Sequence, residues 1–362
     1  MMTSMSRFAH AEGGPAAGEA FSPSRLKIAR QRLGLTVTGL AQLSGVSLRS
    51  LTGYESGAQQ PSAENRSKLA SALRVPDTFF SQDDLEPVTS TGVSFRKLSK
   101  TTAQRRDAVL ASATLTLGFF RVIEESFSLP LQDIPTLDTV EPESAADMVR
   151  RRWGLGDRPV SNMVHLLESK GVRFASLDSA YSDIDAFCFV RDGVPYVFMN
   201  TSKSAERQRF DAAHELGHLV LHRGQDMDVA ESKERENQAN RFASAFLMPQ
   251  SGILRQAMAG ANLERILVGR SFWKVAAMAL TYRLHDLHLL SDWQYRSMCV
   301  ELSDQGFRSK EPGGVVPETS SLLRQTVYGR ERRVGIAQAA AALSLYPDEV
   351  RAFIQRLVPT VA

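Results

Sequence analysis

The sequence predicts a mostly helical α+β protein. Apolar residues recur at helical spacing in two regions far apart in the chain, residues 24–54 and 213–243, whereas strand-like runs are confined to residues 171–198. A length of 362 residues suggests two or three domains. With 43% hydrophobic and 23% charged residues, the composition is that of chains that build packed cores, which argues against a mainly disordered protein.

The first 22 residues are rich in Gly and Ala and contain no apolar run, so we expect a disordered tail there. Nothing in them resembles a signal peptide, and no stretch of the chain approaches the ~20 apolar residues of a membrane span. We therefore expect a cytoplasmic protein without a membrane partner. Cys188 and Cys299 are far apart and outside any paired metal spacing, so we expect reduced, partly buried thiols.

The elements of the N-terminal domain follow from capping and turn residues. Residues 24–33 have helical apolar spacing and end at Gly34. Thr36 can cap a second helix, which Gly45 closes in a tight turn, and Ser47 can cap a third helix that runs through Tyr54. Two short helices joined by a Gly turn indicate a helix-turn-helix motif.

With the continuation Tyr54-Glu55-Ser56-Gly57-x-x-x-Pro61 and Leu69-Ala70-x-x-Leu73-x-Val75-Pro76, residues 24–80 resemble the five-helix Xre-type repressor domain. The resemblance implies a homodimer that binds double-stranded operator DNA at half-sites about one helical turn, ~34 Å, apart. It also implies a set of DNA-binding positions, which are Thr36, Ser47, Leu48, Arg49, Ser50, Thr52 and Gly53.

This third helix has few side chains that could read bases directly. Only Arg49 can make a bidentate contact to guanine, and Gly53 offers no side chain. Val37 stands where Gln often follows the capping Thr in this family. DNA shape and phosphate contacts would then matter more. A degraded domain that binds a protein partner instead remains the alternative.

The charge of the N-terminal domain agrees with DNA binding. Residues 24–76 contain eight Lys and Arg against two Glu, which gives +6, whereas the whole chain carries only +3. The positive charge is thus confined to the predicted reader of DNA. The alternative is that a small helical bundle can be basic without any role in binding nucleic acid.

A basic connector at residues 93–98 leads to a predicted helix from about Thr101 to Phe127. One face of this helix carries an apolar stripe, formed by Val109, Ala113, Leu117 and Phe120. Such a stripe most often packs into the core, here against the following domain. The alternative is that this stripe forms a dimer interface.

Strand-like segments follow further along the chain. Residues 171–177 are predicted as a strand, and residues 187–190 and 194–198 as a hairpin around Arg191-Asp192-Gly193. A sheet edge beside the helix at residues 213–222 would let an extended peptide lie across that helix by strand addition.

The helix at residues 213–222 contains His-Glu-x-x-His. Residues four apart share a helix face, so His214 and His218 can point two imidazoles at one Zn²⁺ ion. Glu215 lies at the edge of the same face, where it can act as the general base that takes a proton from water and passes it to a leaving amine. The motif also occurs by chance in helices whose histidines are only surface or core residues.

A third ligand favours the zinc interpretation. Glu236 lies in a second helical segment, and two His with one Glu is a known catalytic zinc set. Asn240, one turn beyond Glu236, could brace a ligand histidine through its other ring nitrogen. We expect His222 to have a supporting or structural role rather than to bind the metal. His285 and His288 are expected to be packing or surface residues.

The run from Glu206 to His218, followed by Glu236-x-x-Ala239-Asn240-Arg241-Phe242-Ala243-x-x-Phe246-Leu247-Met248-Pro249, resembles the ImmA/IrrE family of metallo-endopeptidases over about residues 140–290. The resemblance implies a zincin-like domain that binds Zn²⁺ through His214, His218 and Glu236, with Glu215 catalytic and a peptide or protein as substrate. Asp211 stands where Thr is expected in many members. This departure touches no ligand but adds a charge one turn before His214.

The C-terminal part is the least informative, with two predicted helices at residues 335–343 and 346–350. They are most simply packing elements, although a second DNA reader and a sensor surface are alternatives. The expected partition is a tail at 1–22, a helix-turn-helix domain at 23–80, a linker and connecting helix at 81–135, a zinc metallopeptidase-like domain at 136–295 and a helical region at 296–362.

Two classes of function follow from the sequence. In the first, the chain is a DNA-binding transcription regulator, expected to be a repressor, whose zinc peptidase cleaves itself or a partner regulator on a signal. In the second, the repressor is not proteolytic and its zinc domain is a sensor or an interaction scaffold. The intact Glu215 favours the first class, because a purely structural zinc site does not require a base.

Overall fold

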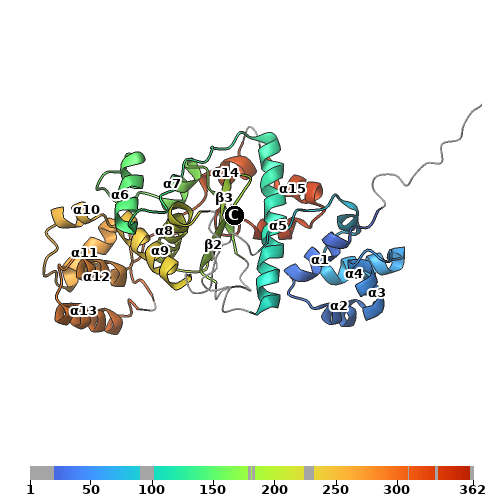
Figure 1. Ribbon diagram of the computed structural model, residues 1–362, viewed down its shortest axis with the longest axis horizontal. Coiled ribbons are helices and arrows are strands. Elements are labelled where there is room, and N and C mark those ends of the chain that lie inside the picture. The colour runs from blue at the N-terminus through green and yellow to red at the C-terminus, as the bar shows by residue number, and fades with distance from the viewer. Residues whose placement is uncertain are drawn as a thin grey trace, which may run out of the picture.

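The computed structural model describes residues 20–89, 102–177, 181, 184–223, 232–308, 310–330 and 333–358. These residues form a mostly helical molecule with one three-stranded sheet, as the sequence predicted. In Figure 1 the N-terminal helical domain lies at one end, the sheet and the long helix α5 lie in the middle, and α10–α13 form the other end. The basic connector at 93–98 and Thr101 lie outside the described residues.

The N-terminal domain is formed by α1 (Pro23–Arg32), α2 (Val37–Ser44), α3 (Leu48–Glu55), α4 (Ala63–Leu73) and η1 (Asp77–Ser81). The predicted caps are present, because the side chains of Thr36 and Ser47 accept hydrogen bonds from the N–H groups of Gly39 and Ser50. Gly45 ends α2 with a left-handed φ of 70°. The last of the five expected helices is only a 3₁₀ turn.

The predicted tail at residues 1–22 ends too late in the sequence, because Phe21 and Ser22 belong to the folded domain. Phe21 is buried, and its ring packs against Tyr54 and Phe80, at centroid distances of 6.3 and 5.4 Å. The Ser22 hydroxyl caps α1 by accepting from the Arg25 N–H. The folded domain therefore begins before Pro23, because its core needs the Phe21 ring.

The sheet is formed by β1 (Arg173–Ser176), β2 (Ala186–Arg191) and β3 (Val194–Met199), in the order β1-β3-β2. The predicted hairpin is confirmed: β2 and β3 pair antiparallel through a turn at Asp192 and Gly193, which have φ of 53° and 77°. β1 pairs with β3 in parallel. This order leaves β2 at one edge of the sheet.

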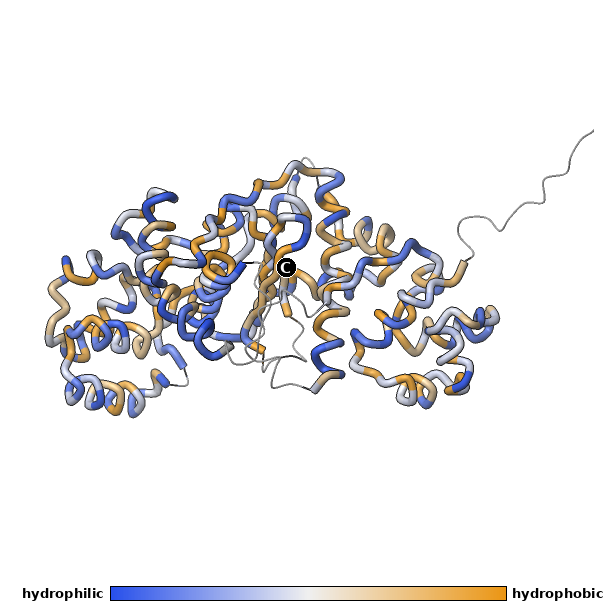
Figure 2. Tube along the Cα trace, viewed as in Figure 1, coloured by the Kyte–Doolittle hydropathy of each residue, from blue (hydrophilic) through white to orange (hydrophobic). Residues whose placement is uncertain are grey.

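The sheet lies between α5 (Ala103–Ser126) and α8 (Ala205–Leu221). On one face, the ring of Phe120 on α5 packs against the ring of Tyr196, with 5.7 Å between the ring centroids. On the other face, the Cys188 thiol donates a hydrogen bond to the Glu215 carbonyl of α8 at 3.6 Å. Figure 2 shows how hydrophobic residues concentrate on the strands and recur along α5. The four residues of the predicted α5 stripe are at most 4% exposed. The prediction that this stripe packs into the core is therefore confirmed. These four residues are buried within the chain and do not offer a surface for a dimer interface.

The remaining helices surround α8 and extend the molecule away from the N-terminal domain (Figure 1). They are α6 (Pro142–Arg152), α7 (Met163–Ser169), α9 (Ser232–Leu247), α10 (Gln250–Arg255), α11 (Leu263–Trp273), α12 (Ala277–Asp286) and α13 (Asp292–Asp304). α9 packs along α8, and α6 packs on α9. Within the described ranges, no helix combines the length and the apolar character that crossing a membrane would need.

The C-terminal helices α14 (Ser321–Tyr328), α15 (Ile336–Leu343) and α16 (Pro347–Ala352) pack against the rest of the chain. The N–H of Ser176 on β1 donates to the Phe353 carbonyl at 2.8 Å, so the C-terminal segment borders the second sheet edge. Glu349 on α16 forms an ion pair with Arg32 of α1. The packing interpretation of this region is thus confirmed.

Candidate metal centre and nucleic-acid interface

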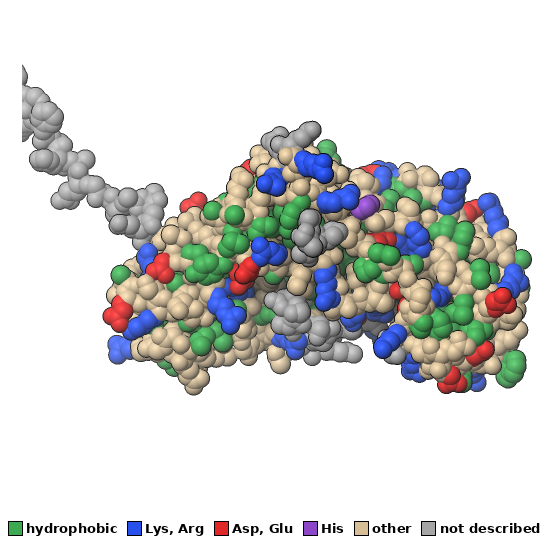
Figure 3. All heavy atoms as spheres, turned by 180° about the vertical axis from the view of Figure 1, so that it is seen from behind, with side chains coloured by type: hydrophobic (Ala, Val, Ile, Leu, Met, Phe, Trp, Pro, Cys, Tyr) green, Lys and Arg blue, Asp and Glu red, His purple; other side chains and the backbone are tan. Residues whose placement is uncertain are grey.

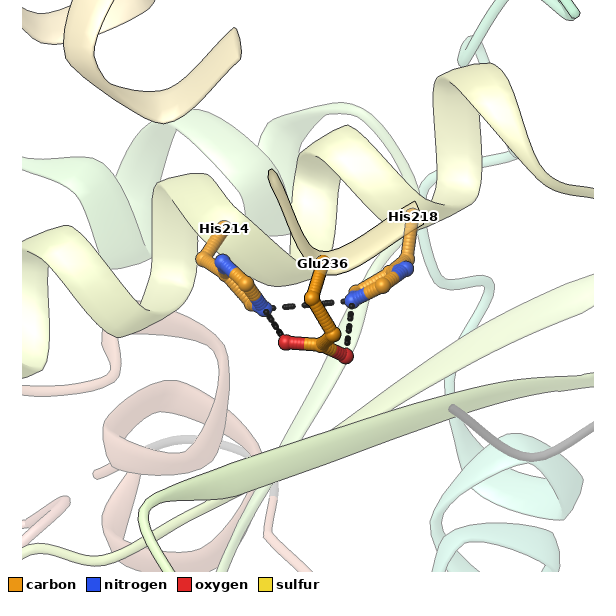
Figure 4. Close-up of side chains that lie close together, drawn as sticks. All are labelled: His214, His218 and Glu236. Atoms are coloured by element: carbon orange, nitrogen blue, oxygen red, sulfur yellow. Dashed lines mark hydrogen bonds and ion pairs between the residues drawn. The ribbon is translucent and has the colours of Figure 1, made fainter. Parts of the chain in front are cut away.

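Two helices bring three metal-ligating side chains together (Figure 4). His214 and His218 point from α8 toward the carboxylate of Glu236 on α9. The two Nε2 atoms are 3.1 Å apart, and each lies 3.3 Å from one carboxylate oxygen. The three side chains are only 7–11% exposed. The residues that the spacing predicted as ligands therefore converge on one point.

Gly217 allows this convergence. A Cβ built at Gly217 would lie 3.1 Å from the Cα of Ala239 and 3.2 Å from its carbonyl oxygen. Only glycine lets the backbone of α9 approach α8 so closely. The approach brings Glu236, less than one turn before Ala239, over the two histidines.

The other ring nitrogens are held by hydrogen bonds. His214 donates from Nδ1 to Asn240 Oδ1 at 3.0 Å. Gln238 Oε1 accepts from Nε2 of His222 at 2.8 Å, so the Nδ1 of His222 is free to accept from the Nδ1 of His218 at 3.0 Å. Both chains of bonds leave an Nε2 lone pair facing the centre, which is the orientation that a metal ligand needs.

This donor set fits a divalent cation. Two nitrogen lone pairs and a carboxylate face one another at about 3 Å, an arrangement that a cation would stabilise. Next to it, Oε2 of Glu215 is buried without a hydrogen-bond partner among the described residues. Such an acceptor is suited to a ligand or a water molecule that enters the centre.

Burial is the largest single influence on each pKa in the centre, although for two of the four groups the neighbouring charges together outweigh it. It raises the pKa of Glu215 to about 7, against the opposing effects of the neighbouring His214 and Cys188. It lowers the pKa of His218 to about 4. Burial also acts to raise the pKa of Glu236, but the two neighbouring histidines together outweigh it and hold that pKa at about 2. For His214, burial is outweighed by Glu236 and Glu215, and its pKa is raised. A proton therefore competes with a metal for this site.

Asp211, the residue that departs from the family pattern, is buried one turn before His214. Burial raises its pKa to about 6, although its carboxylate pairs with Arg207 at 3.0 Å. His285 lies elsewhere, where it bonds Asp292 at 2.7 Å and stacks on Tyr295, and His288 is exposed. Cys188 and Cys299 are both free thiols, and Cys188 is fully rather than partly buried.

The predicted DNA-reading helix α3 presents few free polar groups. Leu48 and Arg49 are exposed, and no described residue pairs with Arg49. Ser47 and Ser50 bond each other at 2.8 Å, and the Thr52 hydroxyl donates to the Leu48 carbonyl at 3.0 Å. Among the predicted DNA-binding positions of α3 and its cap, Arg49 therefore has an exposed polar side chain that no described residue pairs with.

Gln59 is a further residue on this face that the sequence did not suggest. Its side chain lies across α3 at Gly53, where a built Cβ would approach the Gln59 amide to 2.9 Å. The glycine therefore makes room for an exposed amide from the next loop. The only signal in the sequence was the absence of a side chain at position 53.

Much of the positive charge of this domain is internal. Arg30 is buried in a bidentate pair with Glu55, at 2.6 and 2.9 Å, and Arg32 pairs with Glu349. Arg25 is buried and donates to the Asp83 carbonyl at 2.7 Å. On the face shown in Figure 3, Lys and Arg side chains are scattered over the whole molecule. The local charge of +6 is therefore weaker evidence for DNA binding than the sequence alone suggested.

Fold and site together define a helix-turn-helix protein that carries a metallopeptidase-like domain. Two family models match this chain: the Helix-turn-helix model at residues 26–80 and the IrrE N-terminal-like domain, a peptidase family, at residues 167–285. A comparison with curated proteins finds no match. The chain is thus a helix-turn-helix domain fused to an ImmA/IrrE-like domain.

Proposed function

We propose that this chain is a transcriptional repressor whose zinc-dependent endopeptidase domain cleaves itself or a partner regulator on a signal. The observation that carries the proposal is the buried, unpartnered carboxylate oxygen of Glu215 beside three converging metal-ligating side chains. A structural metal site would need the ligands but not this acceptor.

His214, His218 and Glu236 would hold the zinc ion. The set of two imidazoles and one carboxylate leaves one coordination position open, as catalytic zinc sites do. Zinc supplies Lewis acidity, which makes water nucleophilic near neutral pH and polarises a peptide carbonyl. Asn240 and His222 orient the ligand imidazoles through the bonds described above.

Glu215 would move the proton. It takes a proton from the attacking water and returns it to the leaving amine, so that no charged amide nitrogen has to depart. Its neighbour on the sheet, Cys188, places strand β2 directly against α8 at this residue.

The peptide substrate would bind along β2. β2 has a neighbour only on the side of β3, and no described residue forms a backbone hydrogen bond to its outer edge. An extended peptide can add to such an edge as a further strand. The same strand contacts α8, so the added peptide would pass the centre.

The helix-turn-helix domain would bind operator DNA as a homodimer. α3 lies at the end of the molecule (Figure 1). The Arg49 side chain is exposed and would be free to reach guanine. Two such domains would read half-sites ~34 Å apart.

One observation favours the second candidate function, a repressor whose zinc domain is only a sensor or scaffold. The three ligand side chains are at most 11% exposed and Glu215 is buried, so the centre of this conformation is nearly closed to solvent. A closed centre suits a structural or sensing metal as well as a peptidase that opens on a signal.

The two functions are separated by an incubation experiment. Purified protein would be incubated with zinc, operator DNA selected from random duplexes, and candidate partner regulators, in parallel with Glu215→Gln. A discrete fragment that appears only with the wild-type chain supports the peptidase. Absence of any fragment in both samples, under conditions in which the partner is bound, supports the sensor.

A further inference from the structure

A cavity of about 410 Å³ lies on the seam between the DNA-binding domain and the rest of the chain. Its walls come from α1, from residues 85–89 and from α5. This volume lies within the ~300 to 1,000 Å³ of small-molecule sites, which often occur at domain interfaces. None of the proposed metal ligands or DNA-binding positions lines it.

The floor of the cavity is apolar and well packed. Ile28 of α1 faces Leu110 and Ala111 of α5, and all three are buried. The N–H of Val88, which also lines the cavity, donates to the Thr114 hydroxyl at 3.0 Å. The floor therefore offers contact to a small apolar group without an unsatisfied backbone donor.

One positive and one negative side chain line the cavity from two different helices. Lys27 of α1 lines the cavity, is exposed, and has no pairing partner in the described parts of the chain. Asp107 of α5 accepts a hydrogen bond from Gln31 at 3.3 Å, which places its carboxylate opposite Gln31. Lys27 and Gln31 are four residues apart on α1, so their backbones are separated by about 6 Å along the helix. The ammonium of Lys27 and the carboxylate of Asp107 therefore line one cavity from two different helices.

We propose that this seam binds a free α-amino acid with an apolar side chain. The ligand carboxylate would pair with Lys27, its ammonium with Asp107, and its side chain would lie on Ile28 and Leu110. Because the two opposite charges line the same cavity from α1 and α5, a zwitterion can pair with one charge on each side. A ligand with a single charge would leave either Lys27 or Asp107 without an opposite charge.

The seam gives such a ligand access to the DNA-binding domain. Polar contacts that hold α1 to the rest of the chain include the bond from Gln31 to Asp107, a bond from the Tyr181 hydroxyl to the Arg32 carbonyl at 3.2 Å, and the ion pair of Arg32 with Glu349. A ligand that joins Lys27 to Asp107 would add a link between α1 and α5. The cavity would therefore act as an effector site, with free amino acid as the signal.

Calorimetric titration of the full-length protein tests the proposal. L-leucine and L-phenylalanine are titrated singly, with L-lysine, 4-methylpentanoate and 3-methylbutylamine as probes that lack the apolar side chain, the ammonium or the carboxylate. We expect saturable binding of at least one of the two apolar amino acids. The three other probes should bind at least about tenfold more weakly, because each lacks one of the three contacts.

Variants locate the site. Lys27→Gln and Asp107→Asn should each weaken binding at least about tenfold, and Ala111→Leu should block it by filling the floor. Lys68→Gln, which removes an exposed lysine of the same domain outside the cavity, should leave it unchanged. Circular dichroism checks that each variant is folded. No saturable binding of either amino acid, equal binding of 4-methylpentanoate, or unchanged affinity in both charge variants would overturn the proposal.

Discussion

The candidate metal centre and the face of α3 that is predicted to read DNA are both built on short sequence motifs in helices, yet they differ in how their polar groups are held. At the centre, the ligand histidines have their second nitrogen fixed by Asn240 or His222, and a second helix closes over them. On α3, the hydroxyls bond within their own helix and its cap, and Arg49 is free. A motif becomes a preorganised site only when another element closes on it. For α3 the closing element would be DNA itself.

The comparison predicts that substitutions at the centre have larger effects than substitutions on α3. The largest effect is expected for the ligands. His214→Ala or Glu236→Ala should abolish stoichiometric zinc binding, because each leaves only two protein ligands. Metal analysis after dialysis measures this, with His285→Ala as the control, since that histidine lies outside the centre. Full zinc in both variants would show that the metal binds elsewhere.

The next effect concerns the base. Glu215→Gln keeps the shape of the side chain but removes the proton acceptor, so hydrolysis should fall by at least the ~100-fold typical of a lost general base. Zinc content and DNA affinity should persist. In cells, a reporter under the target promoter should stay in one state and ignore the inducing signal. A response equal to that of the wild type, with no fragment in either strain, would leave the domain as a sensor.

A smaller effect is expected for the residues that orient the ligands. His222→Ala and Gln238→Ala each break the chain of bonds that fixes the ring of His218, and should lower zinc affinity about 10- to 100-fold. Zinc should still bind stoichiometrically at saturation, which separates positioning from ligation. Competition with a chelator measures the affinity, and His288→Ala is the matched control. An unchanged affinity would mean that the packing of α8 alone holds His218.

The sequence could predict what depends on spacing along one element. His214 and His218 follow from the helical repeat, and the Asp192-Gly193 turn follows from its φ requirements. It could not predict partners that depend on how helices cross. The bond from His222 to Gln238 joins the residue after α8 to α9, and no periodicity in the sequence predicts it.

The charge of the N-terminal domain shows the same limit. Composition counts Arg30 and Arg32 as surface cations available to DNA, but a folded chain can use them inside. Glu55 lies 25 residues from Arg30, and Glu349 lies 317 residues from Arg32. Only the three-dimensional structure separates these internal cations from Arg49, which is free.

On the DNA-reading face, the main effect is expected at Arg49. Arg49→Ala should lower the preference for a selected operator over random DNA by about 1 to 3 kcal/mol, the contribution of one bidentate contact to guanine. Binding titrations with both DNAs at one low salt concentration measure the preference. The control is Arg74→Ala, an exposed cation at the end of α4. Footprinting without protection of the operator at low salt would contradict the DNA-reading role as a whole.

The smallest effect is expected at Gln59, whose amide occupies the space above Gly53. If this amide contacts a base or a phosphate, Gln59→Ala should weaken operator binding by the ~0.5 to 1.5 kcal/mol of a neutral hydrogen bond, less than the loss at Arg49. Gly53→Ala should have a similar effect, because its Cβ would displace the Gln59 side chain from α3. Gln60→Ala, which removes the neighbouring exposed amide, is the control. Equal operator affinity in wild type, Gln59→Ala and Gly53→Ala would restrict direct readout to Arg49 and leave the remaining specificity to DNA shape.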